Sequence, residues 1–131
     1  MLIDANIFLE VLLEQEKSEN CKAFLRKVLE GNISAIVSSF TIDSIILSMT
    51  RNNIKKEKIR LFLLSLSKYK GLRIYQVSIK DRINSLDLMS KYNLDYEDAL
   101  ILQSAISLKF TKIISFDKHF DKIKEIKRVE P

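Results

Sequence analysis

Cysteine and histidine are almost absent from this sequence of 131 residues, which contains one of each, Cys21 and His119. A single cysteine excludes a disulfide bond within the chain, and one cysteine with one histidine excludes the usual Cys/His zinc sites. Cys21 lies on an apolar helical stripe, where a buried and unreactive thiol is the ordinary interpretation. This cysteine usage suits a reducing compartment, and we expect a cytoplasmic protein.

Glycine and proline are also scarce, since the chain has two glycines and one proline. So few leave no segment that resembles a flexible linker, and no internal repeat or low-complexity stretch interrupts the chain. The 47% of hydrophobic residues supplies enough apolar side chains for a core. We therefore expect residues 1–131 to fold as a single domain.

Long hydrophobic runs are missing as well, because no apolar stretch approaches the roughly 20 residues that a membrane span requires. Asp4 interrupts the N-terminal segment that would otherwise look like a signal sequence, so we expect no membrane partner. Lysine and arginine outnumber aspartate and glutamate, which gives a net charge of +5. This excess can contact phosphates, but lysine-rich faces are often only solvated helix surfaces, so charge alone does not establish nucleic-acid binding.

Hydrophobic periodicity divides the chain into helical and strand-like segments. Apolar residues three and four positions apart over 21–29 predict a helix, and a β-branched run follows at 33–37. Helical spacing of apolar residues over 42–49 and 59–66 predicts two more helices before a short strand at 72–75. Gly31 follows the helix at 21–29 and Gly71 follows the helix at 59–66, so both glycines look like helix C-caps.

Two further helices are predicted in the second half of the chain. Ser78 and Asp81 have the spacing of a capping box. The helix that begins there has an apolar stripe that we expect to be buried, formed by Ile79, Ile83 and Leu86. The segment 99–106 is apolar on nearly every side, which predicts a central helix. The order of two helices after each strand, with a final strand near 126–129, predicts an α/β fold with a mostly parallel sheet covered by helices.

Aspartates occur where strand-like segments end. Asp4 follows the first of these segments, Asp95 and Asp98 open the apolar helix, and Asp117 follows the run at 112–116. Right-handed crossovers bring the carboxyl ends of parallel strands to one edge, where ligands bind in α/β domains. Clustered carboxylates repel one another unless a cation neutralises them, and oxygen ligands are those that Mg²⁺ and Mn²⁺ prefer. The pattern therefore indicates a metal site.

Three segments resemble motifs of PIN-domain ribonucleases, and most closely those of VapC-type toxins. They are Leu2-Ile3-Asp4-Ala5-Asn6, Asp95-Tyr96-Glu97-Asp98-Ala99-Leu100-Ile101 and Ile114-Ser115-Phe116-Asp117-Lys118-His119-Phe120. They occur in the family's order and span essentially the full chain. The resemblance implies a three-layer α/β/α sandwich, a carboxylate cluster that binds Mg²⁺ or Mn²⁺, and metal-dependent cleavage of RNA. It also implies the toxin role in a toxin–antitoxin pair, with a cognate antitoxin protein and a homodimer as partners.

The resemblance assigns roles to individual residues. Asp4, Asp98 and Asp117 match the catalytic aspartates of the family that bind the metal ion. Asn6 and Ser115 match polar companions of these aspartates, and we expect them to support the metal cage and position the substrate.

The remaining family carboxylate is usually a glutamate in the helix after the second strand, and its nearest match here is Asp43. We expect Asp43 to be the fourth catalytic residue, although its side chain is shorter by one methylene. This departure leaves an alternative open, namely a catalytically weak or inactive PIN-like module that binds RNA or a protein partner. A metal titration and a nuclease assay separate the two hypotheses.

Several candidates also have a purely structural explanation. Asp95 suits a helix N-cap, and Asp98 suits the first turn of a helix, where a carboxylate interacts favourably with the helix dipole. Asp43 suits the polar flank of an apolar helical stripe. We expect Glu97 and His119 at the surface, since nothing in the sequence gives His119 a partner that would make it a general base.

Overall fold

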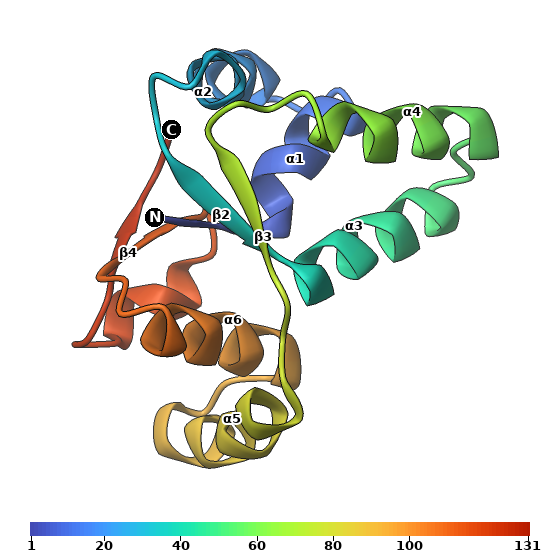
Figure 1. The fold of residues 1–131 in the computed structure, drawn as a ribbon. Coiled ribbons are helices and arrows are strands. Elements are labelled where there is room, and N and C mark those ends of the chain that lie inside the picture. Colours follow the sequence, from blue (N-terminus) through green and yellow to red (C-terminus); the bar gives the residue numbers. More distant parts are fainter.

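Five short strands form one sheet at the centre of the protein in the computed structural model, which describes residues 1–131 (Figure 1). The strands are β1 (Leu2–Ile3), β2 (Ala35–Ser38), β3 (Leu72–Tyr75), β4 (Lys112–Ile114) and β5 (Lys127–Val129). Their order in the sheet is β3-β2-β1-β4-β5, and every neighbouring pair is parallel. The predicted α/β fold class and parallel sheet are therefore confirmed.

Two helices lie on each of the first three connections between strands, as the periodicity predicts. They are α1 (Ala5–Leu12), α2 (Ser18–Glu30), α3 (Ser39–Arg51), α4 (Lys56–Leu66), α5 (Ile79–Tyr92) and α6 (Tyr96–Ser107). A short 3-10 helix, η1 (Lys118–Lys122), joins β4 to β5. Figure 1 shows α1 to α4 on one side of the sheet and α5 and α6 on the other, which gives three layers. None of these helices combines the length and the apolar character needed to cross a membrane.

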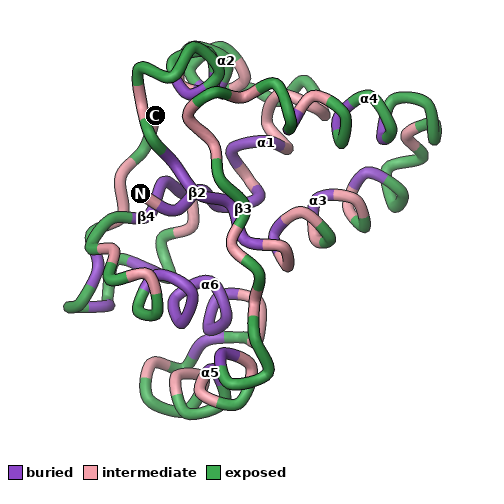
Figure 2. Tube along the Cα trace, viewed as in Figure 1, coloured by how far each residue is buried: buried purple, intermediate pink, exposed green.

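The buried strands divide their side chains between the two outer layers, because successive residues of a strand point to opposite faces. Ile3 and Ile114 belong to the hydrophobic cluster beneath α1 to α4, whereas Leu2 and Ile113 belong to the cluster on the side of α6. Figure 2 shows burial concentrated along β2 and α6. Residues 98–105 of α6 are all buried, which confirms the predicted central helix.

Helix α5 is rotated about its axis, so that it buries a different face from the one that its sequence predicts. Ile79, Ile83 and Leu86, expected in the core, are 55% to 72% exposed. The buried residues of α5 are instead the polar Asp81 and Ser85. The expectation of a buried apolar stripe is therefore wrong.

The reason for this orientation is a buried hydrogen-bond network around Asp81. Its carboxylate accepts hydrogen bonds from the Tyr75 hydroxyl at 2.8 Å and the Ser107 hydroxyl at 2.6 Å, which join α5 to β3 and α6. Asp81 also forms the predicted capping box with Ser78. Burial alone would raise the pKa of Asp81, but the hydrogen bonds together lower it to about 2, so the group stays ionised. These bonds fix the side of α5 that carries Asp81 inward, together with Leu88 and Met89, which pack against the core, and they leave the stripe of Ile79, Ile83 and Leu86 outside.

The two glycines serve different purposes. Gly31 ends α2 in the left-handed region with φ of 85°, as expected for a helix C-cap. Gly71 is not a cap, because α4 already ends at Leu66. A Cβ atom at Gly71 would lie 2.1 Å from the carbonyl oxygen of Ile33 and 2.8 Å from that of Val28. Gly71 therefore allows the chain to pass close to the end of α2 as it enters β3.

Candidate metal centre

Asp4 lies at the end of the central strand β1. Ile3 pairs with Ile114 of β4, so Asp4 and Ser115, the residues that follow these strands, emerge side by side at one edge of the sheet. Asp4 is also the N-cap of α1, where its Oδ1 accepts a hydrogen bond from the backbone N–H of Ala5 at 2.7 Å. One residue therefore ends a strand, begins a helix and places a carboxylate at this edge.

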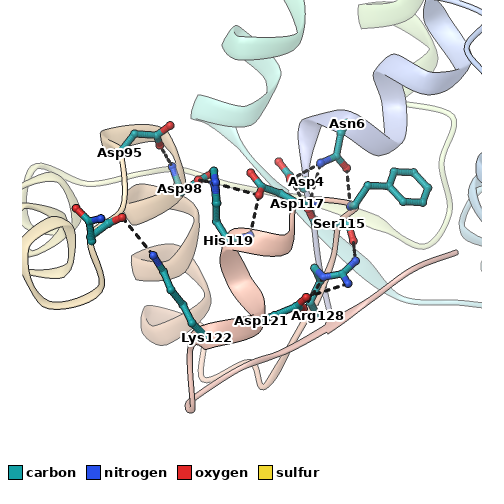
Figure 3. Close-up of polar contacts among 12 residues, drawn as sticks. Asp4, Asn6, Asp95, Asp98, Ser115, Asp117, His119, Asp121, Lys122 and Arg128 are labelled. Atoms are coloured by element: carbon teal, nitrogen blue, oxygen red, sulfur yellow. Dashed lines mark hydrogen bonds and ion pairs between the residues drawn. The ribbon is translucent and has the colours of Figure 1, made fainter.

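Asn6 and Ser115 hold the aspartates in place (Figure 3). Oδ2 of Asp4 accepts hydrogen bonds from the Ser115 hydroxyl at 2.6 Å and from Nδ2 of Asn6 at 2.8 Å. The Asn6 carbonyl accepts the backbone N–H of Phe116 at 3.3 Å, and the Ser115 hydroxyl accepts that of Asp117 at 2.9 Å. Both polar residues predicted for the site are thus brought to it, and their contacts orient carboxylates.

Asp98 and Asp117 reach the same place from other elements. Asp98 is in the first turn of α6, and its backbone N–H donates to Oδ1 of Asp95, the N-cap, at 2.8 Å. Asp117 follows β4 and caps η1. Nδ1 of His119 lies 3.1 Å from both Oδ2 of Asp98 and Oδ1 of Asp117. One donor atom from each of Asp98, Asp117 and His119 lies within 4.8 Å of the others, which suits a single cation.

Sequence reasoning missed His119 as a member of this group. Its side chain is 66% exposed, as expected for a surface residue, yet it contacts two carboxylates. The hydrogen bond with Asp98, together with the charge of Asp117, raises the pKa of His119. The only signal in the sequence was its position two residues after Asp117, a distance that a short helical turn closes.

The carboxylates of Asp4 and Asp98 are buried, and too few positive charges lie near them to stabilise their ionised forms. Asp4 is 5% exposed, and burial raises its pKa to about 6, with the charges of Asp98 and Asp117 adding to the effect against the hydrogen bonds to Asp4. Burial likewise raises the pKa of Asp98 to about 6, although the hydrogen bond from His119 opposes the shift. A bound cation would favour the ionised form of both groups.

These side chains line a cleft with a volume of about 300 Å³. Its acidic part is formed by Asp4, Asp98 and Asp117 together with Asp95 and Glu97 of the N-terminal end of α6. Helix α3 forms another wall of the cleft, which has no carboxylate. Its residues are Ser44, Ser48 and Arg51, which are four and three positions apart and so share one face of the helix. Arg51 is the only cationic residue that lines the cleft.

Asp43 does not line this cleft, contrary to the expectation for the fourth catalytic residue. Its side chain is exposed, because it is rotated by about 100° around α3 from the neighbouring Ser44, which faces the cleft. The carboxylate that meets this wall belongs instead to Glu97 of α6. Glu97 is half-buried, and it accepts a hydrogen bond from the Ser44 hydroxyl at 2.5 Å. The sequence predicts Glu97 at the surface, whereas the contact with Ser44 holds it at the wall of the cleft.

The donor set fits a divalent cation. Carboxylate oxygens with one imidazole nitrogen are ligands that hard and borderline divalent ions accept. Asp98, Asp117 and His119 would hold such an ion. The carboxylate of Asp4 already accepts three hydrogen bonds, but it offers about four lone-pair positions, so one remains for a cation.

Comparisons with known proteins agree with this geometry. The sequence matches the family model of the PIN domain over residues 1–126. Among solved structures, VapC20 of Mycobacterium tuberculosis, described as a sarcin-ricin loop cleaving toxin, is 11% identical with a TM-score of 0.79, over 99% of this chain and 98% of that chain. VapBC2 from Rickettsia felis, bound to a DNA fragment from its promoter, is 15% identical with a TM-score of 0.75, over 98% and 96% of the two chains. A toxin–antitoxin complex from Klebsiella pneumoniae is 20% identical with a TM-score of 0.68, over 96% and 94%. No curated protein matches the sequence significantly.

Proposed function

The chain belongs to the PIN-domain family, and from that premise we propose that it is a metal-dependent endoribonuclease and the toxin of a type II toxin–antitoxin pair. The family resemblance seen in three motifs is confirmed by the match. The observation that carries the proposal is the convergence of Asp4, Asp98 and Asp117 in one cleft, where burial disfavours their ionised forms and a cation would stabilise them. The description of VapC20, a protein of the same fold, as a cleaving toxin supports it.

Mg²⁺ or Mn²⁺ is the cofactor that we propose. Such an ion, when bound, lowers the pKa of water and stabilises negative charge on a phosphodiester. Asp98, Asp117 and His119 would hold it, and Asp4 is kept beside them by its hydrogen bonds. Hydrolysis by water needs no nucleophile from the protein.

RNA is the substrate that we propose for the cleft. A chain of phosphates must approach an acidic centre, so positive or neutral hydrogen-bond donors are needed beside it. Arg51 and Ser48 of α3 provide such donors on their wall of the cleft, whereas the Ser44 hydroxyl already donates to Glu97. Arg51 forms no ion pair with the carboxylates and is free to contact a phosphate. The net charge of +5 favours the same encounter.

Cleavage of a mixed RNA pool by the purified protein tests the proposed function. We expect cutting with Mg²⁺ or Mn²⁺ and a loss of at least about a hundredfold in EDTA, because the buried carboxylates alone cannot activate water. Adding excess Mn²⁺ to the EDTA sample should restore the rate. Equal cutting with and without EDTA would contradict metal dependence.

A second candidate function is a PIN-like module that binds RNA or a protein without cutting. The observation that favours it is the absence of a carboxylate on the cleft face of α3, since Asp43 points to solvent. In that case RNA would bind, but no metal would produce cleavage.

We also propose that a cognate antitoxin protein binds this chain. The structures of similar fold from Klebsiella pneumoniae and Rickettsia felis are complexes of that kind. Leu61 and Leu64 are exposed leucines of α4, and they offer apolar side chains for a partner helix. Purification of the chain together with the product of an adjacent gene would support this partner.

The exposed stripe of α5 supports a homodimer. Ile79, Ile83 and Leu86 form a continuous apolar row that a second copy could cover. We expect Ile83→Glu to raise the dissociation constant of the dimer at least about tenfold, because a charge would be placed in an apolar contact. Analytical ultracentrifugation would measure the change. Asn20→Glu, which adds the same charge to exposed α2, is the control, and a wild-type protein that stays monomeric at high concentration would overturn the prediction.

A further inference from the structure

The wall of the cleft formed by α3 presents no carboxylate of its own. Its cleft-facing positions are occupied by Ser44, Ser48 and Arg51, which offer two hydroxyl groups and a guanidinium. The only acidic residue of α3, Asp43, is exposed on another face of the helix. Any carboxylate on this side of the cleft must therefore come from another element.

Glu97 of α6 fills that position. It is the second residue of α6, directly before Asp98, and both residues line the cleft. Its Oε1 accepts a hydrogen bond at 2.5 Å from the hydroxyl of Ser44, which lies 53 positions earlier in the chain. Its Oε2 has no hydrogen-bond partner, and no lysine, arginine or histidine forms an ion pair with it.

A carboxylate in the first turn of a helix is favoured by the helix dipole, which by itself would explain an acidic residue at position 97. The dipole does not explain the contact with α3, because a residue that only complements the helix end would remain in solvent. The Ser44 hydroxyl orders a flexible side chain, which costs conformational entropy, and it does so beside the four aspartates that line the same cleft. Ordering like charges together is unfavourable unless a cation is present to neutralise them.

We propose that Glu97, held by Ser44, is the fourth carboxylate of the metal centre and increases its affinity for a divalent cation. Glu97 does not belong to the close group of Asp98, Asp117 and His119, so it acts as a positioning residue around the ion. Carboxylates in such outer positions typically contribute about tenfold to a hundredfold in metal affinity. The inference rests on the proposed function, since it assigns a further residue to the same centre.

The test is the affinity of the purified protein for Mn²⁺ alone, measured by isothermal titration calorimetry and by electron paramagnetic resonance of the free ion. We expect Glu97→Gln to weaken binding about tenfold, because it removes a charge while keeping the shape of the side chain. Asp43→Asn, which changes the rival carboxylate, should bind as the wild type does. Glu57→Gln, on an exposed position of α4, is the matched control for a lost surface charge.

A second variant keeps the test decisive if Glu97→Gln fails to fold. Ser44→Ala leaves the charge in place but releases Glu97, and we expect a smaller loss of about threefold. Wild-type affinity in Glu97→Gln, or in Ser44→Ala where only that variant folds, would overturn the role of Glu97. If Asp98→Asn lost binding in the same experiment, the metal centre and the proposed function would still stand. A wild-type protein that bound no Mn²⁺ would overturn both.

Discussion

Replacing Asp4 with asparagine is expected to lower metal-dependent RNA cleavage at least about a hundredfold without unfolding the protein. Asparagine has nearly the shape of aspartate, and its carbonyl can still accept a hydrogen bond from the Ser115 hydroxyl or from the backbone of Ala5. What it lacks is the negative charge at the point where β1 meets the cleft. The loss therefore reports on the cation and not on the fold.

The stability of the same variant provides the internal control. Burial makes ionised Asp4 unfavourable in the metal-free protein, so Asp4→Asn should have a free energy of unfolding equal to or greater than that of the wild type at about pH 7.5. Asp98→Asn should lose activity in the same way, while Asp87→Asn, on an exposed position of α5, should cut RNA at the wild-type rate. Cleavage that survives in Asp4→Asn and Asp98→Asn would show that the activity does not arise in this cleft.

The stability of the metal-free protein is expected to fall by about 3 kcal/mol as the pH rises from about 4 to 7. The pKa of Asp4 is raised from 3.8 to about 6, so the folded protein keeps a proton that the unfolded chain has already released in this window. A group of this kind contributes stability that is present below the unfolded pKa and lost as the pH passes the folded pKa. The raised pKa of Asp98 acts in the same direction, and the raised pKa of His119 extends the fall above pH 6.5.

Mn²⁺ should reverse this loss, because it binds the ionised carboxylates of the folded state. We expect the increase in melting temperature caused by Mn²⁺ to be small at about pH 5 and largest above about pH 6.5. Chemical denaturation across this pH range in EDTA measures the fall in stability, and thermal denaturation in EDTA and in Mn²⁺ measures the change in melting temperature. Asp81 does not interfere, because its pKa is lowered to about 2 and its contribution is lost only in stronger acid. A stability curve with the same slope in wild type and in Asp4→Asn would show that Asp4 is not the titrating group.

The succession of helices and strands could be predicted from the sequence, because hydrophobic periodicity and β-branched runs report directly on each element. Periodicity located an apolar stripe on α5 but assigned it to the wrong side. Which face of a helix points to the core depends on the neighbouring elements. Here Asp81 is held inward by hydroxyl groups from β3 and α6. Those partners come from elements whose positions are set only by the assembled fold.

The aspartates of the site could be predicted because each follows a strand or begins a helix, and parallel strands end at the same edge. The residues of α3 that face the cleft could not be predicted, because successive residues of a helix point in directions about 100° apart. That rotation separates Asp43, which is exposed, from Ser44, which meets Glu97. The contact of His119 with two carboxylates likewise depends on the path of η1.

The position of β1 in the middle of the sheet determines when the site can exist during synthesis. Of the five strands β1 is made first and its neighbour β4 is made fourth, and Ser115 lies 111 positions after the carboxylate that it holds. A growing chain on the ribosome thus carries Asp4 without the residues that orient it. The cleft is completed only when β4 has emerged and paired with β1, so the oriented carboxylate depends on residues that are made more than a hundred positions later.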